Sequence, residues 1–96
     1  MSVSLFEIPG QTGKYGYEIQ FGRSKIKQEH APAINGLYYM SQIEAQQLAD
    51  FIDAKMVAGL PWGVSLEQVE NLWDGIKTPQ QLIDEELAQN GVWCLD

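Results

Sequence analysis

A chain of 96 residues can bury one hydrophobic core and has no room for a second, so we expect a single domain over residues 1–96. Hydrophobic residues make up 45% of the chain and charged residues 20%, and this composition argues against a disordered protein. The formal net charge is −7, which disfavours direct binding to nucleic acid because a phosphate backbone would repel the chain.

The only cysteine is Cys94, so an internal disulfide and a cysteine-based metal cluster are both excluded. The first residues contain neither a basic leader nor a long apolar stretch, and we therefore expect no secretory signal and no membrane helix. Together these features predict a cytoplasmic protein that has no metal site, no cofactor and no membrane association.

The first forty residues follow the two-residue period of β-strands. The clearest strand is predicted from Tyr15 to Phe21, where apolar and polar or glycine residues alternate. Lysines on both sides of Ile26 are typical of an edge strand. The sequence therefore predicts an antiparallel sheet of three or four strands within residues 1–40. Its shorter strands are expected at residues 3–8, 25–28 and 37–40.

The second half of the chain has apolar residues at helical spacing and three capping boxes, in which Ser or Thr is followed three residues later by Glu or Gln. The boxes are Ser41 with Glu44, Ser65 with Gln68, and Thr78 with Gln81. Glycines near the end of each apolar pattern are expected to stop the helices. The predicted elements are a main helix over residues 41–58 and two shorter helices over residues 66–74 and 79–89.

One face of the main helix is apolar and is expected to cover one face of the sheet. That helix face consists of Ala45, Leu48, Ala49, Ile52 and Met56. It should meet the strand row formed by Tyr17, Ile19 and Phe21. The predicted fold class is therefore α+β.

Residues 17–72 resemble a family of short, uncharacterised bacterial domains, known mainly from Bacteroidetes as a domain of unknown function. The residues that carry the resemblance are Tyr17-x-Ile19, Ile26-x-Gln28, Pro32-Ala33-Ile34, Ser41, Ala45, Lys55, Gly59-Leu60-Pro61 and Val64-Ser65-Leu66. The resemblance implies a hairpin followed by a helix, and it implies no catalytic residue. The chain departs from the family at Glu29, where a proline is usual, and in residues 76–96, which extend past the usual end of the family.

His30 is the only histidine, and a histidine in a loop can serve as a general base. Nothing in the sequence places a nucleophile, such as Ser24, Ser41 or Cys94, beside it, so a histidine in a surface turn is the favoured interpretation. The carboxylates of residues 84–86 cannot converge on one metal ion, because consecutive helix positions point about 100° apart.

Aromatic and apolar residues outside the predicted core are candidate binding residues. Trp62 lies in the link between the first two helices, where an indole can either fill the core or anchor a partner. Residues 92–95 form an apolar tail after a helix that Asn90-Gly91 is expected to end. The tail either folds back onto its own core, or Trp93 and Leu95 contact a partner, which can be a second copy of the chain.

Residues 41–96 contain ten acidic residues against two lysines, so the helical half is the acidic half. We predict a small, acidic, non-enzymatic module that binds a protein or itself through Trp62, Trp93, Leu95 and His30. Such a module would be a subunit of a larger assembly or an inhibitor of the kind that phages and other mobile elements encode. The alternative is a small enzyme or ligand-binding domain centred on the His30 loop.

Overall fold

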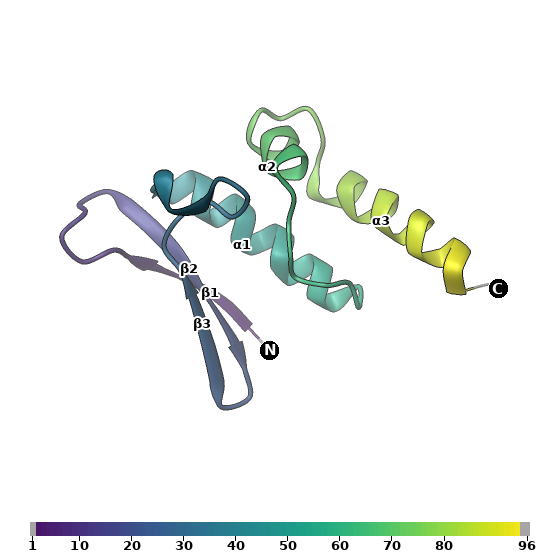
Figure 1. Cartoon of the computed structure of the whole chain (residues 1–96), viewed down its shortest axis with the longest axis horizontal. Coiled ribbons are helices and arrows are strands. Elements are labelled where there is room, and N and C mark those ends of the chain that lie inside the picture. The colour runs from purple at the N-terminus through teal and green to yellow at the C-terminus, as the bar shows by residue number, and fades with distance from the viewer. Residues whose placement is uncertain (1, 95–96) are drawn as a thin grey trace.

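The computed structural model describes the backbone of residues 2–94 and the side chains of these residues except Asn35 and residues 90–94. Within this part of the chain, four strands form an antiparallel sheet around β2 (Figure 1). The strands are β1 (Ser2–Glu7), β2 (Lys14–Phe21), β3 (Ser24–Gln28) and β4 (Met40–Ser41). One edge of β2 pairs with β1, and the other edge pairs with β3 and, near its start, with β4. The predicted antiparallel sheet is confirmed.

The register places the predicted apolar row of β2 on the inner face of the sheet, which packs on a helix. Val3 of β1 lies opposite Ile19, and Leu5 lies opposite Tyr17. Ile19 and Tyr17 are 1% and 4% exposed, and burial raises the pKa of the Tyr17 phenol to about 12. The outer face carries Glu18, which lies opposite Lys27 of β3. The sheet therefore has one buried apolar face and one polar face, as the alternating pattern predicts.

Three helices follow the sheet: α1 (Gln42–Val57), α2 (Leu66–Trp73) and α3 (Pro79–Cys94). All three predicted capping boxes are present. In the first of them, the Glu44 amide donates to the Ser41 hydroxyl at 3.2 Å, and the Ser41 amide donates to the Glu44 carboxylate at 2.9 Å. These bonds satisfy backbone donors that have no partner inside the helix, so they fix where each helix begins.

Both α1 and α2 end in a glycine with left-handed backbone geometry, with φ of 78° at Gly59 and 74° at Gly75. In α1 the Gly59 amide donates to the Met56 carbonyl and the Leu60 amide to the Lys55 carbonyl, which is the Schellman pattern. The predicted stops of these two helices are confirmed.

The third helix is longer than the predicted range of residues 79–89, because it continues through Asn90 and Gly91 to Cys94. The prediction that Asn90-Gly91 ends this helix was wrong. A glycine inside a helix costs only about 1 kcal/mol relative to alanine. An Asn-Gly pair therefore stops a helix only where the chain adopts a left-handed cap.

The strand predicted over residues 37–40 was wrong in most of its length. Residues Asn35–Leu37 form a short 3-10 helix, η1, and only Met40 and Ser41 pair with β2. The reason is that little of the β2 edge is left for this segment to pair with. Because β3 pairs with Tyr17–Phe21, only the first residues of β2 remain available on that edge.

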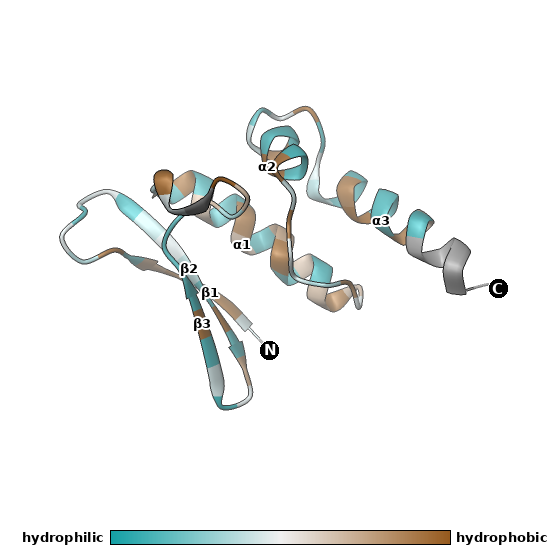
Figure 2. Ribbon diagram, viewed as in Figure 1, coloured by the Kyte–Doolittle hydropathy of each residue, from teal (hydrophilic) through white to brown (hydrophobic). Residues whose placement is uncertain are grey.

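The core lies on both sides of α1, which runs between the sheet on one side and α2 and α3 on the other (Figures 1 and 2). A single cluster of buried residues joins β2, all three helices and the links between them. Its largest fully buried apolar members are Phe51, Ile19, Met40, Leu48, Ile52, Leu82 and Val69. Among the described residues, no helix is both long and apolar enough to cross a membrane.

Candidate functional site

Trp62 lies on the surface, beside a part of the sheet that α1 leaves open. Its side chain is 44% exposed, and its ring centroid lies 6.2 Å from that of Phe21, with the two planes at 50°. Ile26, on the inner face of the neighbouring strand β3, is 36% exposed. We call these three residues, Phe21, Ile26 and Trp62, the Trp62 patch.

The width of a single helix explains why this patch is open. A helix with its side chains is about 10 Å wide, and neighbouring strands lie about 4.8 Å apart. One helix therefore covers about two strands, and α1 packs on β1 and β2. The inner face of β3 extends beyond this cover, so Ile26 stays partly in contact with solvent although Ile19, directly opposite, is buried.

The link that carries Trp62 is fixed at both ends. Before it, Leu60 is 8% exposed and its amide donates to the Lys55 carbonyl at the end of α1. After it, the Gly63 carbonyl accepts a hydrogen bond from the Lys55 ammonium. Because one lysine residue holds both ends, the Trp62 indole is presented from a short anchored segment. Its tilted contact with the Phe21 ring further limits its orientation.

Lys55 is the functional-site residue that sequence reasoning missed. Its side chain is only 2% exposed, and its ammonium lies 2.9 Å from the Glu86 carboxylate of α3 and 5.2 Å from the centre of the Phe51 ring. The same carboxylate oxygen of Glu86 accepts a hydrogen bond from the side-chain amide of Gln68 in α2. The sequence analysis named Lys55 only among the residues that carry the family resemblance. Its position, three residues after Ile52, also places it on the buried side of the helix.

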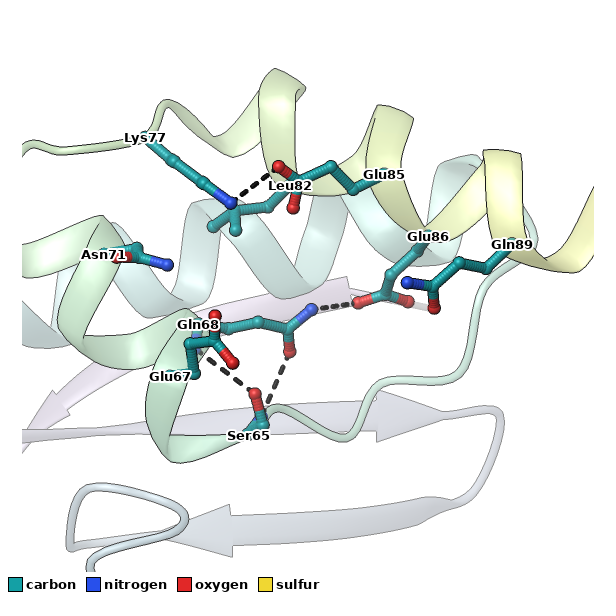
Figure 3. A pocket seen from close by; sticks show the side chains of 9 residues that line it. All are labelled: Ser65, Glu67, Gln68, Asn71, Lys77, Leu82, Glu85, Glu86 and Gln89. Atoms are coloured by element: carbon teal, nitrogen blue, oxygen red, sulfur yellow. Dashed lines mark hydrogen bonds and ion pairs between the residues drawn. The ribbon is translucent and has the colours of Figure 1, made fainter.

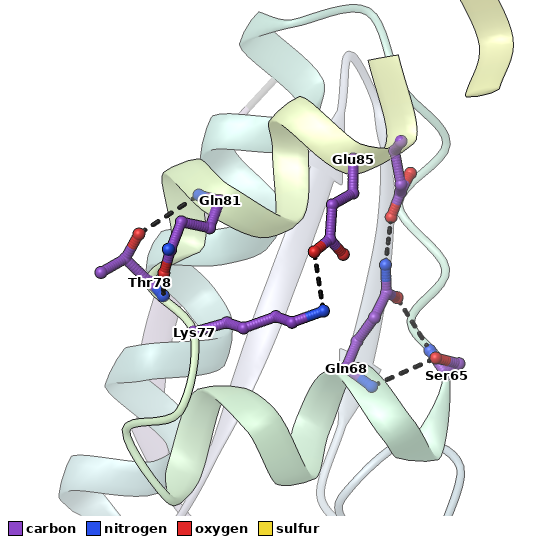
Figure 4. Close-up of polar contacts among 7 residues, drawn as sticks. Ser65, Gln68, Lys77, Thr78, Gln81 and Glu85 are labelled. Atoms are coloured by element: carbon purple, nitrogen blue, oxygen red, sulfur yellow. Dashed lines mark hydrogen bonds and ion pairs between the residues drawn. The ribbon is translucent and has the colours of Figure 1, made fainter. Parts of the chain in front are cut away.

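A polar cavity of about 280 Å³ lies between α2 and α3 (Figure 3). Most of the polar groups on its walls already bond to one another. The Gln68 amide reaches Glu86 across the cavity, while Lys77 pairs with Glu85 at 2.7 Å (Figures 3 and 4). Ser65 is occupied with the cap of α2. This arrangement is that of a structural polar contact between two helices.

Trp73 has a structural role that contrasts with that of Trp62. Its indole nitrogen donates to the Glu44 carbonyl at 3.3 Å, and its ring lies 5.6 Å from that of Tyr38. It is partly buried against the core. Among the described residues, no such hydrogen bond is found for the Trp62 indole.

His30 lies in the loop between β3 and η1, where its backbone forms an isolated bridge with Tyr39. Its ring contacts that of Tyr39, with centroids 4.5 Å apart and the two planes at 46°. The backbone oxygen of His30 accepts a hydrogen bond from the Gln28 side chain. These contacts fix the loop against Tyr39, in the segment that leads into β4. They bring neither Ser24 nor Ser41 into a hydrogen bond with the imidazole within the described part of the chain.

The side chains of the other two predicted binding residues lie outside the described part of the chain. Trp93 belongs to the last turn of α3, and its side chain lies outside the described set. Leu95 lies outside the described residues altogether. The tail is not a strand up to Cys94, because helix α3 continues through it.

The two halves of the chain differ in charge on the surface. In the helical half, Lys55 and Lys77 are paired with Glu86 and Glu85. Among the described residues of this half, the exposed acidic residues that remain are Asp50, Asp53, Glu67, Glu70, Asp74 and Asp84. In contrast, the β2–β3 hairpin exposes Arg23, Lys25 and Lys27. The Trp62 patch therefore lies at the basic hairpin and not on the acidic helices.

The chain matches no protein-family model, no curated protein and no solved structure in our comparisons. The resemblance to a bacterial domain of unknown function stays a prediction.

Proposed function

We propose that the protein is a non-enzymatic protein-binding module and that the Trp62 patch is its contact surface. The observation that carries the proposal is a half-exposed tryptophan, held on an anchored link beside the open inner face of β3. Tryptophan is enriched among the residues that dominate binding energy. A side chain that is already oriented before binding loses less entropy when the partner arrives.

The charge around the patch favours a particular kind of partner. Arg23 occupies the turn that follows Phe21, whereas Lys25 and Lys27 alternate with Ile26 and lie on the outer face of the same hairpin. A partner segment with an apolar side chain and an acidic neighbour would fit the patch and the Arg23 turn together. The acidic helices would repel the same segment, so the charge distribution would also set the orientation of binding.

This proposal is consistent with a role as a subunit of an assembly or as an inhibitor of another protein in the cytoplasm. The alternative, an enzyme or ligand-binding domain around His30, has less support. The imidazole packs on Tyr39 and lies near Gly36, and these contacts offer no acid–base partner. A structural role for His30 accounts for them fully.

The test compares Trp62→Ala with Leu37→Ala in affinity capture from the native host, followed by binding measurements with the purified partner. Leu37 is 89% exposed and belongs to η1, near the start of β2, while Phe21 lies at the end of β2. Leu37→Ala thus removes an apolar side chain that is even more exposed than Trp62, from a distant surface. We expect the partner to be lost with Trp62→Ala and kept with Leu37→Ala. Equal retention by both variants would refute the assignment of the patch.

A further inference from the structure

Within the described residues, neither β1 nor β3 has a further strand on its outer edge, and these two edges differ in how they are protected. The β3 edge carries Lys25 and Lys27, and lysines on an edge strand oppose pairing with another strand. The β1 edge carries Glu7 as its only charged residue and contains no proline, lysine or arginine. An unprotected edge of this kind can accept a further strand.

The outward-facing backbone groups of β1 can be identified from one hydrogen bond. The Ile8 amide donates to the Lys14 carbonyl at 2.9 Å, in the same register as the β1–β2 pairing. Backbone groups point to alternate sides along a strand, so the even-numbered residues of β1 face β2. The amides and carbonyls of Val3, Leu5 and Glu7 therefore point away from the sheet, toward the free edge.

The side chains of β1 are also incompletely covered. Val3 and Leu5 belong to the inner face and pack on the core, yet both remain partly exposed. Their partners on β2, Ile19 and Tyr17, are 1% and 4% exposed. A strand added beyond β1 would cover Val3 and Leu5 from the side, as β1 itself covers Ile19 and Tyr17 of β2.

We propose that β1 pairs with β1 of a second copy, antiparallel and around a two-fold axis at Ser4. Residues that face each other in an antiparallel pair must lie on the same face of the sheet. An axis at Ser4 meets this condition and places Val3 opposite Leu5 of the second copy. The backbone groups of both residues point to the free edge, so each Val3–Leu5 pair forms two backbone hydrogen bonds between the copies. The inner apolar row then continues from one copy into the next.

A second copy fits this edge better than an unrelated peptide because the paired segment is self-complementary. Residues 2–6 contain no charge, so two chains with a net charge of −7 can approach each other at this segment. The rival axis, at Leu5, would place the Glu7 carboxylate opposite Val3 on the apolar face. The axis at Ser4 leaves Glu7 outside the pairing.

A disulfide tests both the pairing and its register. Because Ser4 faces β2, the two Ser4 residues would form a non-hydrogen-bonded pair across the axis, with Cα atoms about 4.5 Å apart. This separation lies within the range of about 4.4–6.8 Å that a disulfide spans. In a Cys94→Ser background, Ser4→Cys should form a covalent dimer under mild oxidation. Ser2→Cys, which shares its face but lies away from the axis, is the control and should stay largely monomeric. Equal cross-linking of the two variants would overturn the register.

A proline substitution tests the edge without cysteine chemistry. Val3→Pro removes an amide that has no bond within the sheet, so the monomer should tolerate it, while the dimer loses a hydrogen bond donor from each copy. Val3→Ala is the matched control, because it removes the side chain and keeps the amide. In sedimentation velocity from micromolar to about 1 mM protein, wild type and Val3→Ala should dimerise, and Val3→Pro should dimerise at least about tenfold more weakly. A monomeric wild type, including one that binds an extended peptide at this edge, would overturn the proposal.

Discussion

Replacing Lys55 by methionine should destabilise the protein by about 2–4 kcal/mol. Methionine keeps most of the apolar stem of the lysine, so little burial energy is lost. The Gly63 carbonyl and the Glu86 carboxylate lose a charged donor, and hydrogen bonds to charged groups contribute about 1.5–3 kcal/mol each. The Glu86 side chain is 20% exposed and can be partly rehydrated. We therefore expect a smaller loss than the sum of the two bonds.

The assay is urea unfolding at neutral pH, with Glu86→Gln and the double variant Lys55→Met/Glu86→Gln completing a thermodynamic cycle. We expect the double variant to be more stable than the sum of the single losses implies, by about 1–3 kcal/mol, because removing both charges leaves neither one buried alone. Single losses that add fully would show that Lys55 and Glu86 do not interact. An unchanged unfolding midpoint for Lys55→Met would refute the reasoning as a whole.

Three further predictions concern the sheet and the start of α1. Ile19→Asp should prevent folding, because it buries an unpaired carboxylate, while Gln20→Asp on the outer face should be tolerated. Circular dichroism distinguishes a folded variant from an unfolded one. Equal tolerance of the two substitutions would mean that the assignment of the inner and outer faces of β2 is wrong. Ser41→Ala should lower the free energy of unfolding by about 0.5–2 kcal/mol, and an unchanged denaturant midpoint would exclude this cap. Burial raises the pKa of Glu44, but hydrogen bonds from Ser41 and Tyr38 outweigh it and hold the pKa below its ordinary value of 4.5. The resulting stability is present above that value and is lost as the pH falls through the lower folded pKa, so the advantage of wild type over Glu44→Gln should shrink between neutral pH and about pH 3.

Much of the fold could be predicted because local chemistry determines it. The capping box at Ser41 depends only on a hydroxyl and a carboxylate three residues apart, and the inner row of β2 depends only on alternation. The two elements that were predicted wrongly depend on distant neighbours. The segment before Met40 does not pair with β2 because β3 already occupies the adjacent edge of β2. The end of α3 depends on whether the chain must turn after Asn90, which no local pattern records.

The candidate site was predicted less well, for the same reason. The sequence indicated that Trp62 was either a core residue or an anchor, and the choice depends on how far a single helix extends over the sheet. Lys55 lies on the buried side of α1, yet its counter-ion, Glu86, comes from a helix that is distant in the chain. Burial of a charge depends on such a partner, so helical spacing alone could not predict it.

Every strand pairing in the described sheet includes β2, and this has a consequence for the rate of folding. The pairings with β1 and β3 are local, because short connections separate these strands from β2. The pairing of Tyr15 with Met40 closes a much longer loop, and its entropy must be lost before the contact forms. We therefore expect the three N-terminal strands to form early. Substitutions in β2 should slow folding, whereas substitutions at Met40 should mainly accelerate unfolding.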